Sequence, residues 1–214
     1  MVDVAVVDYG MGNLHSVAKA VEHVAPGATV AVTGDPATIL SAARVVFPGQ
    51  GAARDCMAAI NSRGLREAIL QAAASKPFLG ICMGLQVLFE HSEEGDTPCL
   101  GVFPGNVVRF DDAKMQDGRG NKLKVPHMGW NNVVQTRPHP LWSGIEDGER
   151  FYFVHSYYVV PADPALAAGT SAYPEPFVCA CARDNVFAVQ FHPEKSATAG
   201  LRLLANFVSW NPSV

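Results

Sequence analysis

A cysteine flanked by glycines is the residue of this sequence best suited to nucleophilic chemistry. Cys82 lies in the segment Gly80–Gly84 (GICMG), directly after an apolar run and before the helix-forming residues 85–89. Glycines two positions before and two after the cysteine let the chain turn sharply from a strand into a helix, which forces the central side chain into a strained, exposed position. A helix that starts there would also favour the thiolate through its dipole. The alternative is a buried cysteine at an ordinary strand end.

A thiolate nucleophile needs a base, and one of the seven histidines is followed at close spacing by an acid. His192 and Glu194 are separated by Pro193, and in an extended segment positions 192 and 194 project to the same side. Glu194 would then fix the imidazole tautomer while His192 faces the cysteine. Alone, this segment also fits a solvated turn. Together with Cys82 it predicts a Cys-His-Glu triad.

Backbone N–H groups that could hold an oxyanion are expected at Gly49, Gln50 and Gly51. These residues follow another apolar strand, and the two glycines leave the N–H groups free of side-chain obstruction. Such groups stabilise the negative oxygen that forms when a nucleophile attacks a carbonyl. A plain β-turn would have the same composition.

The elements that must position these residues alternate in the first half of the chain. Apolar strands are expected at residues 2–8, 29–32, 44–47 and 77–81, with helices at 14–24, after Asp35-Pro36 and at 65–74. This alternation predicts a parallel sheet covered on both faces. The runs at 107–110, 132–135, 150–160 and 177–191 indicate mainly antiparallel strands, and residues 198–208 a final helix.

We therefore expect an α/β fold in a single domain over residues 1–214, with a mostly parallel central sheet, flanking helices and an antiparallel strand extension. The strand at 186–191 should bring His192 to the carboxyl edge of the sheet, where Cys82 also emerges. That edge is the predicted site.

Composition restricts the possible partners and the compartment. The 214 residues are 49% hydrophobic and 17% charged, and 16 basic against 20 acidic residues give a net charge of −4. Without a Lys/Arg cluster, electrostatic binding to nucleic acid or anionic lipid is not expected.

Asp3 and Asp8 near the start argue against a signal peptide, and no apolar run is long enough for a membrane span. Five cysteines without a CxxC pair argue against a disulfide framework or zinc site, so we expect a cytoplasmic protein. Its partner is expected to be a small molecule or another protein.

The segments PGxG, GxCxGxQ and HPE, in this order, resemble those of the class I (triad) glutamine amidotransferases, and the resemblance covers nearly the whole chain. Four further segments are similar to the glutaminase subunits of imidazole glycerol phosphate synthase in histidine biosynthesis: residues 8–14 (DYGMGNL), 125–131 (VPHMGWN), 153–158 (FVHSYY) and 190–196 (QFHPEKS). Met83 and Leu85 stand where that family has Leu and Met. Gln50 stands where Val is frequent, which leaves the resting orientation of its peptide open.

This resemblance implies that Cys82, His192 and Glu194 hydrolyse glutamine through a cysteine thioester. The ammonia would pass to a separate (β/α)8-barrel cyclase subunit, which makes imidazole glycerol phosphate and aminoimidazole carboxamide ribonucleotide. The oxyanion would be held by N–H groups of Met83 and the Gly49–Gly51 region. By the same analogy, glutamine's α-amino and carboxylate groups are held by Gln86, His155, Ser156 and Tyr157. No metal or organic cofactor is implied.

The resemblance also implies a heterodimer interface. The residues that would face the cyclase are Asn13, Pro126, His127, Met128, Gly129, Trp130, Asn131 and Lys195. Trp130 is a candidate anchor because Trp is over-represented at interface hot spots, although a core Trp beside a turn would give the same pattern without the resemblance.

Three other functions have distinct signatures. A glutaminase that serves another synthase would keep the triad and lack the 125–131 segment. A cysteine peptidase or γ-glutamyl hydrolase of similar fold would act without a partner subunit. A non-catalytic regulatory module would have lost a member of the triad, and all three residues are present.

Overall fold

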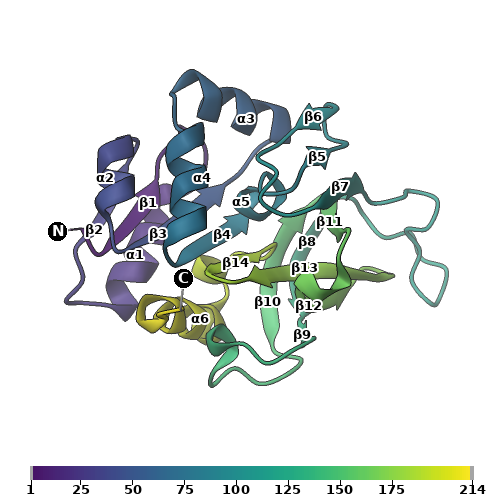
Figure 1. The fold of residues 1–214 in the computed structure, drawn as a ribbon. Coiled ribbons are helices and arrows are strands. Elements are labelled where there is room, and N and C mark those ends of the chain that lie inside the picture. The colour runs from purple at the N-terminus through teal and green to yellow at the C-terminus, as the bar shows by residue number, and fades with distance from the viewer. Residues whose placement is uncertain (1, 213–214) are drawn as a thin grey trace.

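A twisted central sheet runs through the protein with helices on both faces (Figure 1). The structure is a computed structural model and describes residues 2–212. Parallel strands form the first half of the sheet, in the spatial order β2-β1-β3-β4-β14. Their bounds are β1 (Val4–Val7), β2 (Val30–Thr33), β3 (Arg44–Gly49), β4 (Phe78–Cys82) and β14 (Val186–Val189).

Mainly antiparallel strands extend the sheet beyond β14. The main path continues through β13 (Pro176–Arg183), β11 (Tyr157–Pro161), β7 (Gly105–Arg109), β5 (His91–Ser92) and β6 (Thr97–Pro98). Of these strands, β5 and β7 form a parallel pair. A branch adds β12 (Ala167–Ala172) and β9 (Val134–Gln135). A separate ribbon pairs β8 (His127–Asn132) with β10 (Arg150–His155). The expected fold class is confirmed, with the parallel strands in the first half of the sheet and the mainly antiparallel extension after them.

The helices cover the sheet in two layers. On one face lie α2 (Pro36–Ser41), α3 (Ala53–Ser62) and α4 (Arg66–Ser75), and on the other lie α1 (Leu14–Val24) and α6 (Ala197–Ser209). The short helix α5 (Met83–Gln86) follows β4, and single turns of 3-10 helix occupy Pro140–Trp142, Pro164–Leu166 and Pro193–Lys195.

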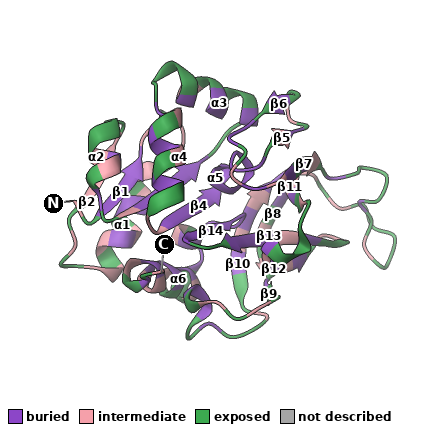
Figure 2. Ribbon diagram, viewed as in Figure 1, coloured by how far each residue is buried: buried purple, intermediate pink, exposed green. Residues whose placement is uncertain are grey.

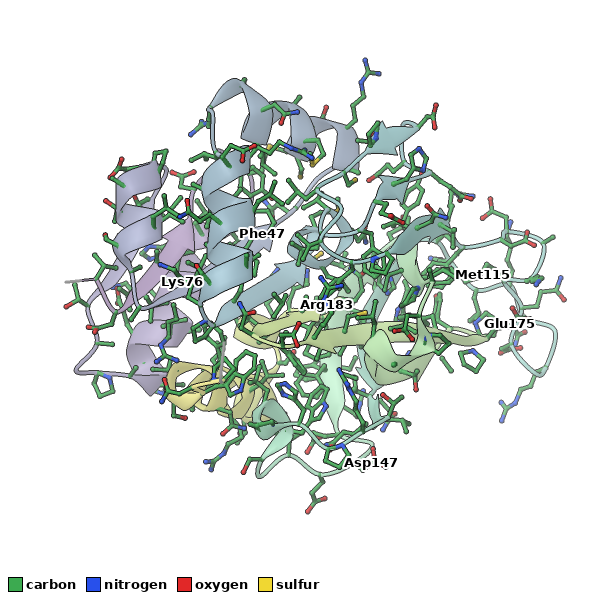
Figure 3. The ribbon with its side chains drawn as sticks, viewed as in Figure 1. Phe47, Lys76, Met115, Asp147, Glu175 and Arg183 are labelled. Carbon is green, nitrogen blue, oxygen red and sulfur yellow. The ribbon has the colours of Figure 1, made fainter. Side chains whose placement is uncertain are left out.

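Alternation along the buried strands builds two hydrophobic cores. In β1, Ala5 and Val7 face one core while Val4 and Val6 face the other, as expected for a strand covered on both sides. Figure 2 shows the central strands buried and the outer surfaces of α3 and α4 exposed. Phe47 lies among the side chains between the sheet and these helices (Figure 3). This packing holds the ends of β3, β4 and β14 rigidly side by side.

Two helices differ from the expectations drawn from the sequence. The predicted helix over 85–89 is wrong beyond Gln86, because the carbonyls of Val87, Leu88 and Phe89 accept hydrogen bonds from residues 100–103 instead of continuing a helix. Helix α3 was not expected, although its buried residues have helical spacing: Ala53, Cys56, Met57 and Ile60. Its first residue lacks a side-chain cap, which removed the usual signal for a helix start. Within residues 2–212, no helix has the length and apolar character that a membrane span requires.

Candidate active site

Cys82 occupies a sharp turn at the end of β4. Its φ of +56° and ψ of −110° lie in a region that non-glycine residues rarely adopt. The turn needs glycine nearby, because a Cβ added to Gly84 would lie 1.8 Å from the carbonyl oxygen of Phe47. The expected strain is present, but the expected exposure is wrong. Cys82 is 5% exposed and reaches solvent through a cavity.

The surroundings of the Cys82 sulfur are polar on one side. The Nε2 of Gln190 lies 3.8 Å from Sγ, and the carbonyl of Val154 lies 4.0 Å from it. The helix that follows Cys82 has only four residues, so its dipole is weaker than that of the longer helix expected from the sequence. Neighbouring side chains are therefore the main source of electrostatic support for a thiolate.

His192 and Glu194 form a buried pair directly after β14. Nδ1 of His192 lies 2.9 Å from Oε1 of Glu194, and the two side chains are 7% and 2% exposed. The segment between them is a 3-10 turn rather than the extended chain that was expected, because Pro193–Lys195 closes on His192. With Nδ1 bonded to Glu194, Nε2 is left for the cysteine, and it has no hydrogen-bond partner among the described residues.

The proton of this imidazole is held strongly. Burial lowers the pKa of His192, but the neighbouring Cys82 sulfur and the Glu194 carboxylate outweigh burial and raise that pKa to about 10. Such an environment stabilises an imidazolium beside a thiolate. This ion pair is the resting state expected of a cysteine nucleophile with a histidine partner.

The expected oxyanion residues lie beside Cys82. Gly49 is the register neighbour of Cys82 on β3, and Gln50, Gly51 and Met83 line the same cavity. Only glycine fits at position 49, because a Cβ there would lie 2.2 Å from the Tyr9 hydroxyl oxygen. The Gln50 carbonyl accepts a hydrogen bond from the Cys56 thiol at 3.5 Å, which fixes the resting orientation of the Gln50–Gly51 peptide.

One cavity of about 610 Å³ joins these groups. It is lined by Gly10, Met11, Gly12, Gln50, Gly51, Cys82, Met83, Gln86, Glu94, Pro126, Val154, His155, Ser156, Tyr157, His192 and Lys195. The four residues expected to hold glutamine are among those that line the cavity: Gln86, His155, Ser156 and Tyr157. Within residues 2–212 no three His, Cys, Asp or Glu side chains are grouped as metal ligands would be.

Sequence reasoning missed two polar residues at the site. Glu94 lines the cavity, and its carboxylate accepts a hydrogen bond from the Ala53 N–H at 2.7 Å. Gln190 is fully buried between the nucleophile and Gln86. Glu94 had no local signal, since it lies in an acidic, turn-rich stretch that resembles solvated surface. Gln190 begins the 190–196 segment that carries the resemblance, but its position after an apolar strand gave no sign of a contact with the nucleophile.

A pair of buried histidines connects the cavity to the 125–131 segment. Nδ1 of His155 donates to the Tyr157 carbonyl at 2.8 Å, so Nε2 of His155 accepts from Nδ1 of His127 at 2.9 Å. Asn131 then donates to Nε2 of His127 at 3.3 Å. Burial lowers the pKa of His127 to about 4 and that of His155 to about 3. Both rings are neutral at pH 7, as this directed chain of hydrogen bonds requires.

This burial predicts acid sensitivity. The folded-state pKa of His155 lies below the ordinary value of about 6.5, so the unfolded chain takes up the proton first as the pH falls. The stabilising effect is complete above about pH 6.5 and should decrease by about 1.4 kcal/mol on reaching pH 5.5. Thermal unfolding at pH 7.5 and 5.5 should show a smaller drop in Tm for His155→Gln than for the unsubstituted protein. Equal drops would contradict a neutral, buried His155.

Some of the residues expected at a partner interface are exposed, and others are buried. Trp130 is 44% and Met128 is 65% exposed, and Trp130 packs edge-on against Tyr152. The core interpretation of Trp130 is therefore wrong. His127 differs from these two, because its side chain is buried and directed toward His155. Lys195 is exposed and also lines the cavity.

Asn13 is also exposed, and its side-chain oxygen caps α1 by accepting from the Ser16 N–H. Pro126, Gly129 and Asn131 complete the set, on or next to β8. Pro126 also lines the cavity. The exposed aromatic surface on β8 thus lies close in sequence to a residue of the cavity wall.

Comparison with known proteins gives consistent results. Residues 5–210 match the family described as glutamine amidotransferase class-I. A protein of Thiobacillus denitrificans named imidazole glycerol phosphate synthase subunit HisH is 75% identical over 99% of this chain and 92% of its own length. A protein of the same name from Aromatoleum aromaticum is 68% identical, over 99% of this chain and 100% of its own length.

Solved structures agree on the fold. A putative GMP synthase subunit from Thermoplasma acidophilum superposes with a TM-score of 0.70, at 18% identity, over 98% of this chain and 93% of that one. A structure described as a glutamine amidotransferase superposes with a TM-score of 0.71, at 16% identity, over 96% of this chain and 97% of that one.

Proposed function

The chain belongs to the class-I glutamine amidotransferase family, and from this we propose that it is the glutaminase subunit of an imidazole glycerol phosphate synthase. It hydrolyses glutamine to glutamate and ammonia for histidine biosynthesis. The observation that supports this most is that Cys82, at a positive φ, and His192, which is paired with the buried Glu194, line one cavity. We place the protein in the cytoplasm, which the five free cysteines favour.

The reaction begins at the Cys82 sulfur. The thiolate attacks the side-chain carbonyl carbon of glutamine, and the C–N bond breaks as His192 gives its proton to the leaving ammonia. Water then attacks the thioester carbonyl carbon while His192 takes a proton from it, and the C–S bond breaks, which releases glutamate and restores the Cys82 thiolate. Glu194 keeps His192 in the tautomer that presents Nε2 to the sulfur.

Backbone N–H groups next to Cys82 stabilise the intermediate. We assign this role to Met83 and to the Gly49–Gln50 region, which adjoins Cys82 in the sheet. Removing one such donor commonly costs about 3 kcal/mol of transition-state stabilisation. Because Gln50 is anchored through its carbonyl by Cys56, this strand has a defined starting geometry.

The rest of the cavity suits the charged end of glutamine. Gln86 has a buried Oε1 without a partner in the described residues, and Glu94 supplies a carboxylate. Both are acceptors, which fits the three donors of an α-ammonium group. We assign them to that group, and the stretch His155–Tyr157, whose Tyr157 carbonyl accepts from Nε2 of Gln86, lines the same cavity.

A partner subunit is proposed at β8. The exposed Trp130 and Met128 form an aromatic and apolar surface on β8, and Lys195 is exposed and lines the cavity. We propose that a (β/α)8-barrel cyclase subunit binds here in a heterodimer and takes up the ammonia. Lys195 is then placed to transmit the partner's state to the catalytic pair.

The proposal is tested by measuring glutamate release by the chain with and without its cyclase subunit. We expect glutamine turnover to need the cyclase, and the complex to incorporate the amide nitrogen of ¹⁵N-labelled glutamine into imidazole glycerol phosphate. Full glutaminase activity without the cyclase would favour an independent γ-glutamyl or peptide hydrolase. No turnover in either sample would overturn the proposal.

Trp130 is the proposed anchor of the interface. Truncating a buried aromatic anchor typically costs about 2 kcal/mol or more, which is about thirtyfold in affinity. Trp130→Ala should therefore weaken cyclase binding in calorimetry by about that factor while the Tm of the free subunit changes little, since the side chain is 44% exposed. Val32→Ala, at another exposed apolar residue on β2, is the matched control and should leave the affinity unchanged. Wild-type affinity for the Trp130 variant would remove this residue from the interface.

A further inference from the structure

Gln190 is a fully buried amide for which the proposed mechanism has so far no role. It follows β14 and lies two residues before His192. Its backbone N–H donates to the Cys179 carbonyl at 2.8 Å, so the main chain is fixed by the neighbouring strand. Burying a carboxamide raises the free energy of the folded state unless its N–H and C=O groups form hydrogen bonds, so both ends of the Gln190 amide need partners.

Both ends of the Gln190 amide contact residues of the site. Its Oε1 accepts from Nε2 of Gln86 at 2.9 Å, and its Nε2 lies 3.8 Å from Sγ of Cys82. The side chain therefore bridges the nucleophile and a residue that lines the substrate cavity. The two contacted residues come from a different segment of the chain, 104 and 108 positions away.

The orientation of the two amides is determined by a main-chain group. The carbonyl of Tyr157 can only accept, and Gln86 contacts it at 3.2 Å, so this end of Gln86 must be the Nε2 donor. The same Nε2 faces Gln190, which must therefore present its oxygen. Nε2 of Gln190 is then the end that faces the Cys82 sulfur, as a donor.

Two consequences follow for the chemistry. An N–H directed at Sγ stabilises the thiolate relative to the thiol, because a hydrogen bond to the charged form favours that form. With its Nε2 held by Gln190 and Tyr157, Gln86 must turn Oε1 elsewhere, and that oxygen is buried and has no partner in the described part of the chain. It remains available as an acceptor for a donor group of the substrate.

We propose that Gln190 is a further catalytic-site residue, which donates a hydrogen bond to the Cys82 thiolate and holds Gln86 in the orientation that binds substrate. The second role rests on the proposed glutaminase function, whereas the first concerns the cysteine alone. One side chain thus adjusts the nucleophile and the substrate-binding amide together.

The donor role is tested by the pH dependence of alkylation of Cys82 with iodoacetamide, with the Cys82→Ala variant giving the background from the other thiols. Gln190→Met keeps the volume but has no donor, and the midpoint of its alkylation profile should rise by about one pH unit. Asn185→Leu removes a buried amide directly before β14 whose Nδ2 donates to the Ala73 and Lys76 carbonyls, away from Cys82, and it should leave the midpoint unchanged. An unchanged midpoint for Gln190→Met would overturn the donor role.

The binding role is tested by glutaminase kinetics of the complex with its cyclase. Gln190→Met should raise KM for glutamine about tenfold, and adding Gln86→Met should raise it little further, because the first change already releases Gln86. Additive effects of the two changes would overturn this role. If Gln190→Met does not fold, Gln190→Glu keeps the acceptor for Gln86 and removes the amide donor, so it should shift the alkylation midpoint while leaving KM near the wild-type value.

Failure of this inference can be told apart from failure of the proposed function. If the unsubstituted complex hydrolyses no glutamine, the proposed function is wrong, and the alkylation profile still decides whether Gln190 acts on Cys82. If the complex is active but neither the midpoint nor KM responds to Gln190→Met, the assignment of Gln190 is wrong and the proposed function stands.

Discussion

Replacing Cys82 by alanine should abolish glutamate formation, with a loss of about 10⁴-fold or more in kcat. The reaction path starts with a bond to the sulfur, and removing the nucleophile of a comparable triad costs about 10⁶-fold in kcat. Glutamate release from the complex, measured at saturating glutamine, checks this expectation. A rate within tenfold of wild type would exclude Cys82 as the nucleophile.

The same variant should bind the cyclase normally. Alanine at position 82 keeps the strained backbone and loses one atom that faces a cavity, so the fold has little to lose. The complex should still form imidazole glycerol phosphate when ammonium salts replace glutamine. Cys181→Ala, at a buried cysteine of the core outside the cavity, is the matched control and should keep glutaminase activity. Loss of the ammonium-dependent reaction would show that the Cys82 substitution damages more than ammonia production.

The parts of this site that could be predicted are those with a local signal. The glycines around Cys82 predict the turn. A Cβ at Gly84 would clash with the Phe47 carbonyl, so only glycine fits there. The acidic residue two positions after His192 predicts the His192–Glu194 pair. Both inferences needed only residue types and short spacing. The order of strands and helices follows in the same way from apolar runs separated by turn residues.

The remaining features depend on contacts between distant segments. Gln86 meets Gln190 across 104 positions, and His127 meets His155 across 28. No local pattern separates a buried, hydrogen-bonded amide or imidazole from one in solvent. β8 was missed for a related reason, since His127–Asn132 alternates in burial but includes a glycine, two asparagines and an exposed Trp. Its pairing with β10 is what makes it a strand.

Replacing His192 by asparagine should reduce kcat/KM nearly as much as loss of the cysteine, by about 10³-fold or more. The thiolate loses its ion-pair partner and the leaving ammonia loses its proton donor, and members of a triad act as a unit. Glu194→Gln should cost less, because His192 can still reach the sulfur. Steady-state kinetics of the complex with its cyclase check both values. A Glu194 variant less active than the His192 variant would contradict the proposed order of roles.

The pH dependence of kcat/KM distinguishes the roles of His192 and Glu194 more clearly than the rates do. Burial alone would lower the pKa of His192, and Cys82 and Glu194 together raise it to about 10, so the imidazole of the unsubstituted enzyme should keep its proton throughout the neutral range. Neutralising Glu194 removes one of the two groups that oppose burial, and the pKa of His192 must fall. The alkaline limb of the kcat/KM profile for Glu194→Gln should therefore move to lower pH. If the two profiles coincide between pH 6 and 10, Glu194 does not hold the proton on His192, and the buried contact at 2.9 Å is structural only.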